Sequence, residues 1–376
     1  MAATLEVVSS PNPIVEVGNC IKWTFIMTGV SDDEQESRFV YWIEDETGQK
    51  LTYPEQLIPG DGVEFSIDLV KDIRNRLYPS IPDYQDLFSS GFLDKPTLSK
   101  QILFNYQVIS FNKLTCETEI VDEQVLPEVL ALGIAGDWFY PIEPGDTKIL
   151  NPKASLNLVH IKSNDWLYVY GPGVVVDITA YKGSTIIGDY SATSSGDRIQ
   201  ALPIGPDNLR DQIPEDTTHY VVSTEGFTWT YQIDCRVDYV DLYYWANGFN
   251  VLTMKADQTS IESSQSLVNQ YNPECSPLSQ QGLTTRGLGI IGKKAYFTHQ
   301  LSKLLDSEVQ ADVLYLSRAL SSPLYYLQVD YIGSSRIIKF IVNTNSSPVL
   351  LNDGFTTLVI TGRLNRDFTG SNTMTP

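Results

Sequence analysis

Histidine, cysteine and basic side chains are scarce in this chain. Of its 376 residues, 3 are His, 4 are Cys and 26 are Lys or Arg, against 46 that are Asp or Glu. The formal net charge of −20 repels the phosphate backbone of DNA and RNA. The composition therefore argues against a nucleic-acid partner and against sites that need clustered His or Cys ligands.

The sequence also lacks the patterns of disulfide-rich, secreted and membrane proteins. The four cysteines (Cys20, Cys116, Cys235 and Cys275) are widely spaced and form no C-x-x-C pair. The first residues contain no basic and apolar signal pattern, and no apolar run approaches the roughly 18 residues of a membrane span. We expect a protein without a membrane span, made in a reducing cytosol, whose thiols are free and buried. The pairing state of the cysteines stays open.

One glycine-rich segment comes close to a nucleotide-binding motif. Gly287 to Lys294 nearly matches the phosphate-binding loop G-x-x-x-x-G-K-[ST] and contains G-x-G-x-x-G. However, Lys294 stands where the loop needs a hydroxyl for magnesium, and no buried strand is predicted before it. We interpret the segment as a glycine-rich bend before Ala295 and predict no bound cofactor.

No catalytic or metal constellation is recognisable either. The histidines (His160, His219 and His299) have no metal-ligand spacing, and no G-x-S-x-G elbow is present. A glycosidase needs only two carboxylates, and Asp177, Asp189, Asp197 and Asp241 are candidates, but 46 acidic residues make chance pairs easy. We predict that the protein is not an enzyme and has no catalytic or metal-binding residue. No EF-hand loop occurs, but calcium binding by oxygen atoms of other loops stays open.

Aromatic residues are plentiful, with 21 Tyr and 14 Phe, and apolar residues often alternate with polar ones. Such alternation places every second side chain on one face of a strand. It predicts strands around the following segments: 21–27, 39–43, 102–108, 166–170, 174–180, 227–231, 240–244 and 338–342. Helical spacing occurs over 69–77, with Asp68 as N-cap, and over 307–320.

These patterns predict a mainly β fold of two or three tandem antiparallel β-sandwich (Ig-like) domains with a few short helices. The expected domains are an N-terminal Ig-like β-sandwich (1–127), a middle β domain (128–236) and a C-terminal β-rich domain (237–366), which contains the helix at 307–320. A polar tail (367–376) follows. Polar loops are expected at 31–37, 189–197 and 259–283, where contact with another surface is more plausible than chemistry.

Two aromatic clusters could act as binding platforms. Tyr243, Tyr244, Trp245 and Phe249 flank Asn247-Gly248, and Trp138, Phe139 and Tyr140 precede a proline. Packing in a core or interface is the favoured interpretation, because aromatic side chains bury large areas. The first four residues are kept as candidate interaction aromatics.

The N-terminal pattern resembles a known family. The resemblance rests on Pro11-Asn12-Pro13, the strands at 21–25 and 39–43, and the run Pro59 to Leu69 with its helix to Leu77; the run Val240 to Phe249 adds to it. These segments look like the immunoglobulin-like module of structural proteins from tailed phages of Bacteroidetes hosts, including crAss-like phages. The resemblance covers about the first 80 residues and some 30 around Tyr244, and it transfers no functional residue.

The resemblance implies a structural protein of a phage virion (tail, baseplate, collar or head decoration) that is assembled in the host cytoplasm. Its partners would be other virion proteins and copies of itself, with host-surface glycan left open. A glycan-binding adhesin or surface protein is the alternative, and a tail-associated polysaccharide hydrolase comes third.

Overall fold

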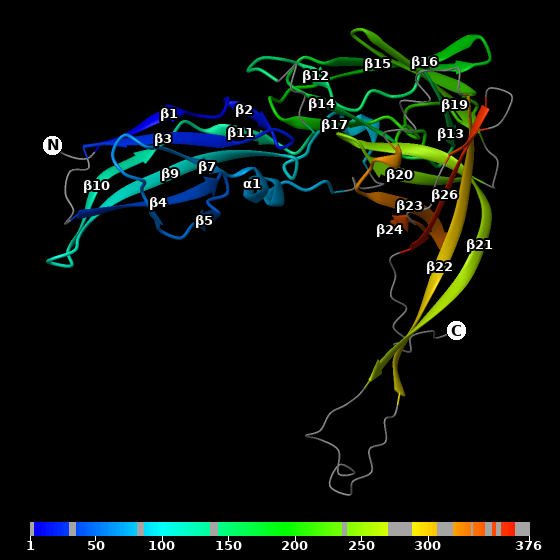
Figure 1. Ribbon diagram of the computed structural model, residues 1–376. Helices are drawn as coiled ribbons and strands as arrows, with labels where there is room; N and C mark the ends of the chain where they lie inside the picture. Colours follow the sequence, from blue (N-terminus) through cyan, green and yellow to red (C-terminus); the bar gives the residue numbers. More distant parts are fainter. Residues whose placement is uncertain are drawn as a thin grey trace, which may run out of the picture. The chain divides into compact units, whose positions relative to one another are not determined.

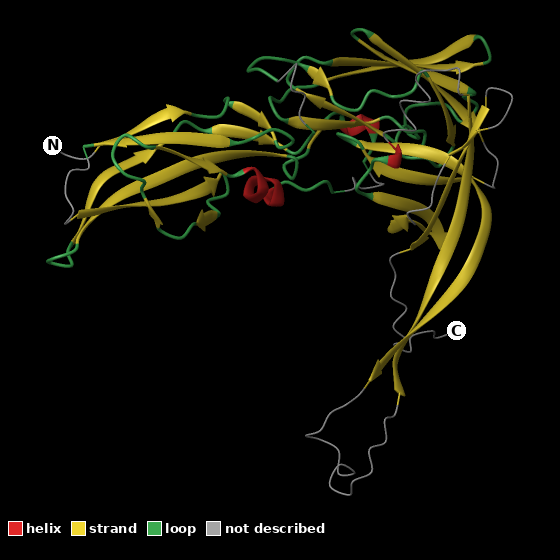
Figure 2. Cartoon of the chain, viewed as in Figure 1, coloured by secondary structure: helices red, strands yellow, loops and turns green. Residues whose placement is uncertain are grey.

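Strands dominate the regular structure of the described residues, which confirms the mainly β fold. The computed structural model describes residues 4–29, 35–80, 86–135, 142–234, 239–269, 288–306, 319–331, 334–342, 348–350 and 355–364. Within these ranges lie strands β1 to β26, the helix α1 (Val70–Arg76) and the 3-10 helix η1 (Phe88–Ser90) (Figure 1, Figure 2). No helix among the described residues is long and apolar enough to cross a membrane.

The chain divides by its internal contacts into two compact units. The first unit comprises residues 1–152, 164–230 and 247–249, and the second comprises 153–163, 231–246 and 250–376. The chain thus passes between the units several times. The three-domain division near residues 127 and 237 stays a prediction.

Two sheets form the N-terminal part of the first unit. One has the order β1-β3-β7, and the other has the order β2-β11-β9-β4-β5, with β10 added on β9 and β6 on β4. Their strands are β1 (Thr4–Ser9), β2 (Ile14–Glu16), β3 (Lys22–Thr28), β4 (Gln35–Asp45), β5 (Lys50–Thr52), β6 (Gln56–Leu57), β7 (Glu64–Asp68), β9 (Ser99–Asn112), β10 (Thr118–Val125) and β11 (Val129–Leu132). Among the described pairs of these two sheets, all are antiparallel except β2 with β11, which is parallel over three residues.

Both sheets contribute to a single aromatic core. Trp23 and Phe25 from β3, Phe39 from β4 and Phe104 from β9 are all 0% exposed and belong to one cluster. Trp23 stacks on Phe104 with ring centroids 4.7 Å apart. The alternation read from the sequence produces this arrangement, because every second residue of each strand faces the core.

The helix α1 follows β7, as the spacing of Leu69, Ile73 and Leu77 predicts. These three side chains are buried in the same core cluster. The helix begins one residue later than expected, with Leu69 in the N-cap position and no side-chain cap there. Asp68 still supports the start, since its Oδ1 accepts a hydrogen bond from the Val70 amide at 3.0 Å.

Two further sheets complete the first unit. One has the order β12-β14-β17-β8, and the other has the order β13-β19-β18-β15-β16. In the second of these sheets, β13 and the end of β19 belong to the second unit. The strands are β8 (Leu93–Asp94), β12 (Lys148–Ile149), β13 (Leu156–His160), β14 (Trp166–Tyr170), β15 (Val175–Lys182), β16 (Thr185–Thr193), β17 (Ile199–Pro203), β18 (His219–Thr224) and β19 (Phe227–Asp234). Every residue of β14 and β17 is buried.

The second unit contains a sheet that returns on itself, which the sequence did not predict. Its order is β22-β21-β20-β23-β24-β26-β25, and β22 pairs with β26 as well as with β21. Its strands are β20 (Tyr239–Trp245), β21 (Phe249–Asn269), β22 (Leu288–Asp306), β23 (Tyr325–Tyr331), β24 (Ser334–Val342), β25 (Pro348–Leu350) and β26 (Phe355–Leu364). Leu242, Leu301, Phe340 and Leu358 belong to a separate core cluster of this unit. The predicted helix at 307–320 lies outside the described residues except for Ala319 and Leu320, which are helical.

Candidate functional site

A highly connected polar group in the first unit is the carboxylate of Asp45, at the end of β4. The segment Asp45-Glu46-Thr47-Gly48 has the composition of a turn, and Gly48 takes a positive φ of 78° there. The Asp45 Oδ1 accepts hydrogen bonds from the Thr47 amide (3.0 Å), the Thr47 hydroxyl (2.6 Å) and the Gln49 amide (3.1 Å). An aspartate that binds the backbone two residues ahead stabilises a turn of this kind. One oxygen of Asp45 therefore fixes the β4–β5 turn.

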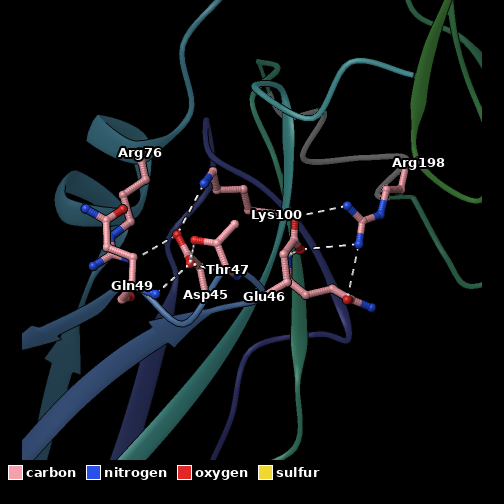
Figure 3. A network of polar contacts seen from close by, with 8 residues as sticks. Asp45, Glu46, Thr47, Gln49, Arg76, Lys100 and Arg198 are labelled. Carbon is pink, nitrogen blue, oxygen red and sulfur yellow. Dashed lines mark hydrogen bonds and ion pairs between the residues drawn. The ribbon is translucent and has the colours of Figure 1, made fainter. Parts of the chain in front are cut away.

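The other oxygen of Asp45 binds two cations. Its Oδ2 lies 3.3 Å from Nη1 of Arg76, at the end of α1, and 3.2 Å from Nζ of Lys100 in β9. The Asp45 side chain is 0% exposed, and the two cationic side chains are mostly buried. The carboxylate thus joins the turn, the helix and the neighbouring strand (Figure 3).

The surroundings of Asp45 favour its ionised form. Burial alone would raise the pKa of this carboxyl, but the hydrogen bonds from Thr47, Lys100 and Gln49 outweigh it and lower the pKa to about 2. A group that releases its proton so readily is a poor general acid or base near neutral pH. The pKa indicates a structural carboxylate.

Glu46, the next residue, extends the network toward β17. Its two carboxylate oxygens lie 3.0 and 3.3 Å from Nη1 and Nη2 of Arg198, which precedes β17. Its Oε2 also accepts a hydrogen bond from the Gln101 amide in β9 at 2.7 Å, and Gln101 Oε1 accepts one from Arg198 at 3.2 Å. A bidentate Arg–carboxylate pair of this kind fixes both the distance and the relative orientation of its two side chains. Figure 3 shows Arg198 and Glu46 facing one another beside the Asp45 turn.

A second buried polar centre forms around Asn208, which is 0% exposed. Its Nδ2 donates to the Asp86 carbonyl and to Asn164 Oδ1, both at 2.8 Å. Its Oδ1 accepts from the amides of Asp165 (2.9 Å) and Gly205 (3.1 Å). All four bonding positions of one amide side chain are used, so Asn208 connects three separate chain segments.

Among the described residues of the first unit, the surface is hollowed in at least two places. The first, of about 260 Å³, is lined by Glu16, Asn19, Cys20 and Lys22 among others. The Glu16 carboxylate there lies 3.6 Å from Nζ of Lys148, and no His is among the lining residues. The second, of about 330 Å³, lies beside β16 and is lined by the aromatic residues Phe88 and Tyr190 together with small and polar residues. Neither lining contains a nucleophile together with a histidine base.

The four candidate interaction aromatics are mostly inside the protein. Tyr243, Tyr244 and Phe249 are 0% exposed. The Tyr243 hydroxyl donates to Gln328 Oε1 at 2.6 Å, and Tyr244 belongs to the core cluster of the second unit. Only Trp245 is partly exposed. Fully buried rings cannot stack on a ligand, and the cluster Trp138 to Tyr140 lies outside the described residues.

Of the candidate carboxylates, Asp177 and Asp189 lie on the same face of the paired strands β15 and β16, since Asp177 pairs with Ser191 and Asp189 with Thr179. Asp177, Asp189 and Asp197 are exposed in the first unit, whereas Asp241 is buried in the second and accepts a hydrogen bond from the Thr253 hydroxyl at 2.7 Å. Asp189 accepts one from the Thr179 hydroxyl at 3.0 Å. In the part of the chain that is described, no three His, Cys, Asp or Glu side chains cluster as metal ligands.

His160, His219 and the glycine-rich segment make contacts that belong to turns, ring stacking and strand pairing. His219 stacks on Tyr181 with ring centroids 4.8 Å apart, and Nδ1 of His160 accepts the Lys162 amide at 3.2 Å. The side chain of His299 lies outside the described residues. Residues 288–294 form part of β22, paired with β21, so they make an extended strand where a phosphate loop would need a strand-to-helix junction.

Two expectations from the sequence are wrong. Cys20 and Cys116 are free, as expected, but both are exposed, whereas buried thiols were predicted. Cys235 and Cys275 lie outside the described residues.

The predicted polar loops are too long, because residues 35–37, 189–193 and 259–269 belong to the strands β4, β16 and β21. These stretches are rich in Ser, Thr, Gln or acidic residues; 35–37 and 259–269 lack the apolar alternation that marks a strand, and 189–193 shows it only in Tyr190 and Ala192. The predicted tail at 367–376 is outside the described residues.

The residues that hold the polar network were not found by sequence reasoning. The Asp45 turn carried a signal in its Asp–Gly spacing, but Arg76, Lys100 and Arg198 carried none, because ion pairs between distant segments leave no local pattern. Comparison with protein-family models finds no match, and comparison with curated protein sequences finds no significant similarity.

Proposed function

We propose that the protein is a structural component of a tailed-phage virion and acts through protein–protein contacts, with its N-terminal sheets as an Ig-like sandwich. The observation that carries the proposal is a two-stranded ribbon in the second unit. Residues 288–297 of β22 pair with 261–269 of β21, while β26 pairs with β22 only from Thr298 onward. Among the described strands, none pairs with the other edge of residues 288–297.

A two-stranded ribbon has little stability of its own in water, because it cannot bury an apolar face. Figure 1 shows β21 and β22 continuing together past the other strands of their sheet. A segment of this kind is stabilised when another polypeptide covers it, which is the arrangement expected in an assembly. The resemblance of the N-terminal segment to phage structural modules supports the same conclusion.

The glycan-binding alternative has less support. It needs exposed aromatic platforms, and three of the four candidate aromatics have no exposed surface. The polar networks around Asp45 and Asn208 fit a scaffold, because each fixes several segments of the chain and leaves the carboxylate of Asp45 fully engaged.

The experiment compares assembly of the native chain with that of a ribbon-shortened variant. Residues 262–296 are replaced by Asn-Gly, a two-residue turn that can join the directly paired Ile261 and Phe297. We expect the native chain to form oligomers by light scattering and to occur in purified phage particles. The variant should keep its unfolding midpoint, because the core of the second unit is retained, but lose assembly.

A matched control changes a different hairpin tip. Leu114, between β9 and β10, is 71% exposed, and Leu114→Ser should leave assembly intact. A native chain that stays monomeric at micromolar concentration and is absent from particles would contradict the proposal. Assembly that survives removal of the ribbon would show that the ribbon is not the contact.

A further inference from the structure

The strand β16 forms an incompletely covered end of its sheet. Only β15 pairs with it among the described strands. Across the pair, Val176, Ile178 and Ala180 of β15 are 0% exposed, but no residue of β16 is buried. Tyr190 and Ala192 of β16, which pair with Ile178 and Val176 and so share their face, are only half-buried. The apolar face of the sheet therefore continues onto β16 without a layer that covers it, which is the situation in which a further strand adds contact area.

A groove follows the free edge of β16. The hollow of about 330 Å³ touches four consecutive residues, Tyr190 to Thr193, and its other side is formed by Phe88, Ser89, Gly91 and Gln212. Because successive side chains of a strand point to opposite faces, a hollow that touches four in a row lies along the edge.

The far side of the groove is attached to β16 by one side chain. The Tyr190 hydroxyl donates a hydrogen bond to the Gln212 carbonyl. A Cβ at Gly188 would lie 2.7 Å from that hydroxyl, so Gly188 is needed for the ring to lie there. The Tyr190 side chain therefore bridges the two sides of the groove.

The backbone of β16 offers bonding groups to this groove. The Ser194 amide donates to the Val174 carbonyl at 3.0 Å, and the Ser194 carbonyl accepts from the Gly173 amide at 2.8 Å, so both groups point toward β15. In an antiparallel pair, successive residues alternate in this respect. The amides of Thr193, Ser191 and Asp189 therefore point away from β15, toward the free edge.

The charges beside the edge select the occupant. Asp189 of β16 and Asp177 of β15 are exposed on the same face of the sheet, since Asp189 pairs with Thr179 and Asp177 with Ser191. Lys182, at the β15 end of the turn into β16, is already paired with Asp216. Antiparallel pairing of two copies centred on β16 would set the two Asp189 side chains directly opposite each other, which is destabilising. A segment with Lys or Arg opposite Asp189 forms a favourable pair of opposite charges instead.

We propose that the free edge of β16 binds an extended polypeptide segment of another protein, in which basic residues alternate with small apolar ones. The segment adds a strand to the sheet through the outward amides of β16. Its apolar side chains cover the half-buried face at Tyr190 and Ala192, and its basic side chains lie near Asp189 and Asp177. This holds whether or not the protein belongs to a virion.

The test measures the fluorescence anisotropy of a labelled, acetylated peptide, Ser-Val-Lys-Val-Lys-Val-Ser, with the full chain. A second peptide has Glu at both Lys positions. We expect the basic peptide to bind and the acidic one to fail. Asp189→Lys should weaken the basic peptide about tenfold and admit the acidic one, since charge pairs across an interface decide specificity.

Ser191→Pro removes an outward amide while the bonds to β15 remain, and proline is tolerated at such edge positions. It should abolish binding with an unchanged unfolding midpoint. The matched control is Glu225→Lys, the same charge change at the exposed turn between β18 and β19, which should bind like the native chain.

Equal binding of the two peptides, or basic-peptide affinity that Asp189→Lys leaves unchanged, would overturn the proposal. So would self-association of the free chain that Ser191→Pro abolishes, because the occupant would then be a second copy. Since none of these readouts involves particles or the ribbon, they fail or succeed independently of the virion proposal.

Discussion

At the scale of single residues, the first unit is organised by a few buried polar side chains that use every bonding position. Asp45 has five donors around two oxygens, and Asn208 uses both of its amide hydrogens and its oxygen. Buried polar groups are costly unless they are bonded in this way. Replacing either one therefore leaves several partners without a bond at once.

The substitution Asp45→Asn should destabilise the protein by about 3 kcal/mol at neutral pH, because Arg76 and Lys100 lose their buried counter-charge. Urea unfolding followed by tryptophan fluorescence measures the loss. The matched change Asp216→Asn, in an exposed pair with Lys182, should leave the urea midpoint where it is.

The effect of Asp45→Asn should depend on pH in a defined direction. The pKa of Asp45 in the folded protein is about 2, below its ordinary value of 3.8. The ionised carboxylate therefore contributes stability that is fully present above about pH 4 and is lost as the pH falls through 2. The difference between the native chain and Asp45→Asn should shrink over that interval. A difference that stays constant from pH 7 to pH 2 would rule out this role.

At the scale of elements, strands with one buried face could be predicted and the others could not. The segments at 21–27, 39–43 and 102–108 carry apolar residues at every second position, and all became core strands. The stretch 189–193 has only Tyr190 and Ala192 as apolar residues, and its strand is only half covered, so its pattern resembled a loop. The sequence thus reports burial more directly than it reports backbone conformation.

The aromatic core between the two N-terminal sheets should dominate the stability of that region. Phe25 is 0% exposed and lies within 6 Å of the rings of Phe39, Phe65, Phe104 and Tyr106. We expect Phe25→Ala to cost about 3–5 kcal/mol in the free energy of unfolding. Phe227→Ala, at a 43% exposed ring, should cost much less. Equal urea midpoints for the two variants would mean that this core is not the main source of stability.

At the scale of the whole molecule, the candidate network was out of reach of sequence reasoning because its members are far apart in the chain. Lys100 lies 55 residues from Asp45, and Arg198 lies 152 residues from Glu46. The return of the second unit's sheet on itself, through the pairing of β22 with β26, was missed for the same reason. The net charge, by contrast, depends only on composition, so the sequence alone predicts its effect on binding to charged partners.

The net charge of −20 should keep the protein off nucleic acids. We expect no shift of labelled duplex DNA in a gel assay at about 0.15 M salt, a condition under which surface charges still act over about 8 Å. A basic DNA-binding protein serves as the positive control. A saturable shift by the chain would contradict the prediction.

The Glu46–Arg198 pair also has a consequence for the order of events during synthesis. The Asp45 turn and its hydrogen bonds from Thr47 and Gln49 can form as soon as those residues leave the ribosome. Arg198 is made 152 residues after Glu46, a delay of roughly 8–30 s at common translation rates. During that interval Glu46 lacks its Arg198 partner, while the Gln101 amide, made 55 residues after Glu46, can already donate to it. The bidentate Glu46–Arg198 contact can form only after Arg198 has been made.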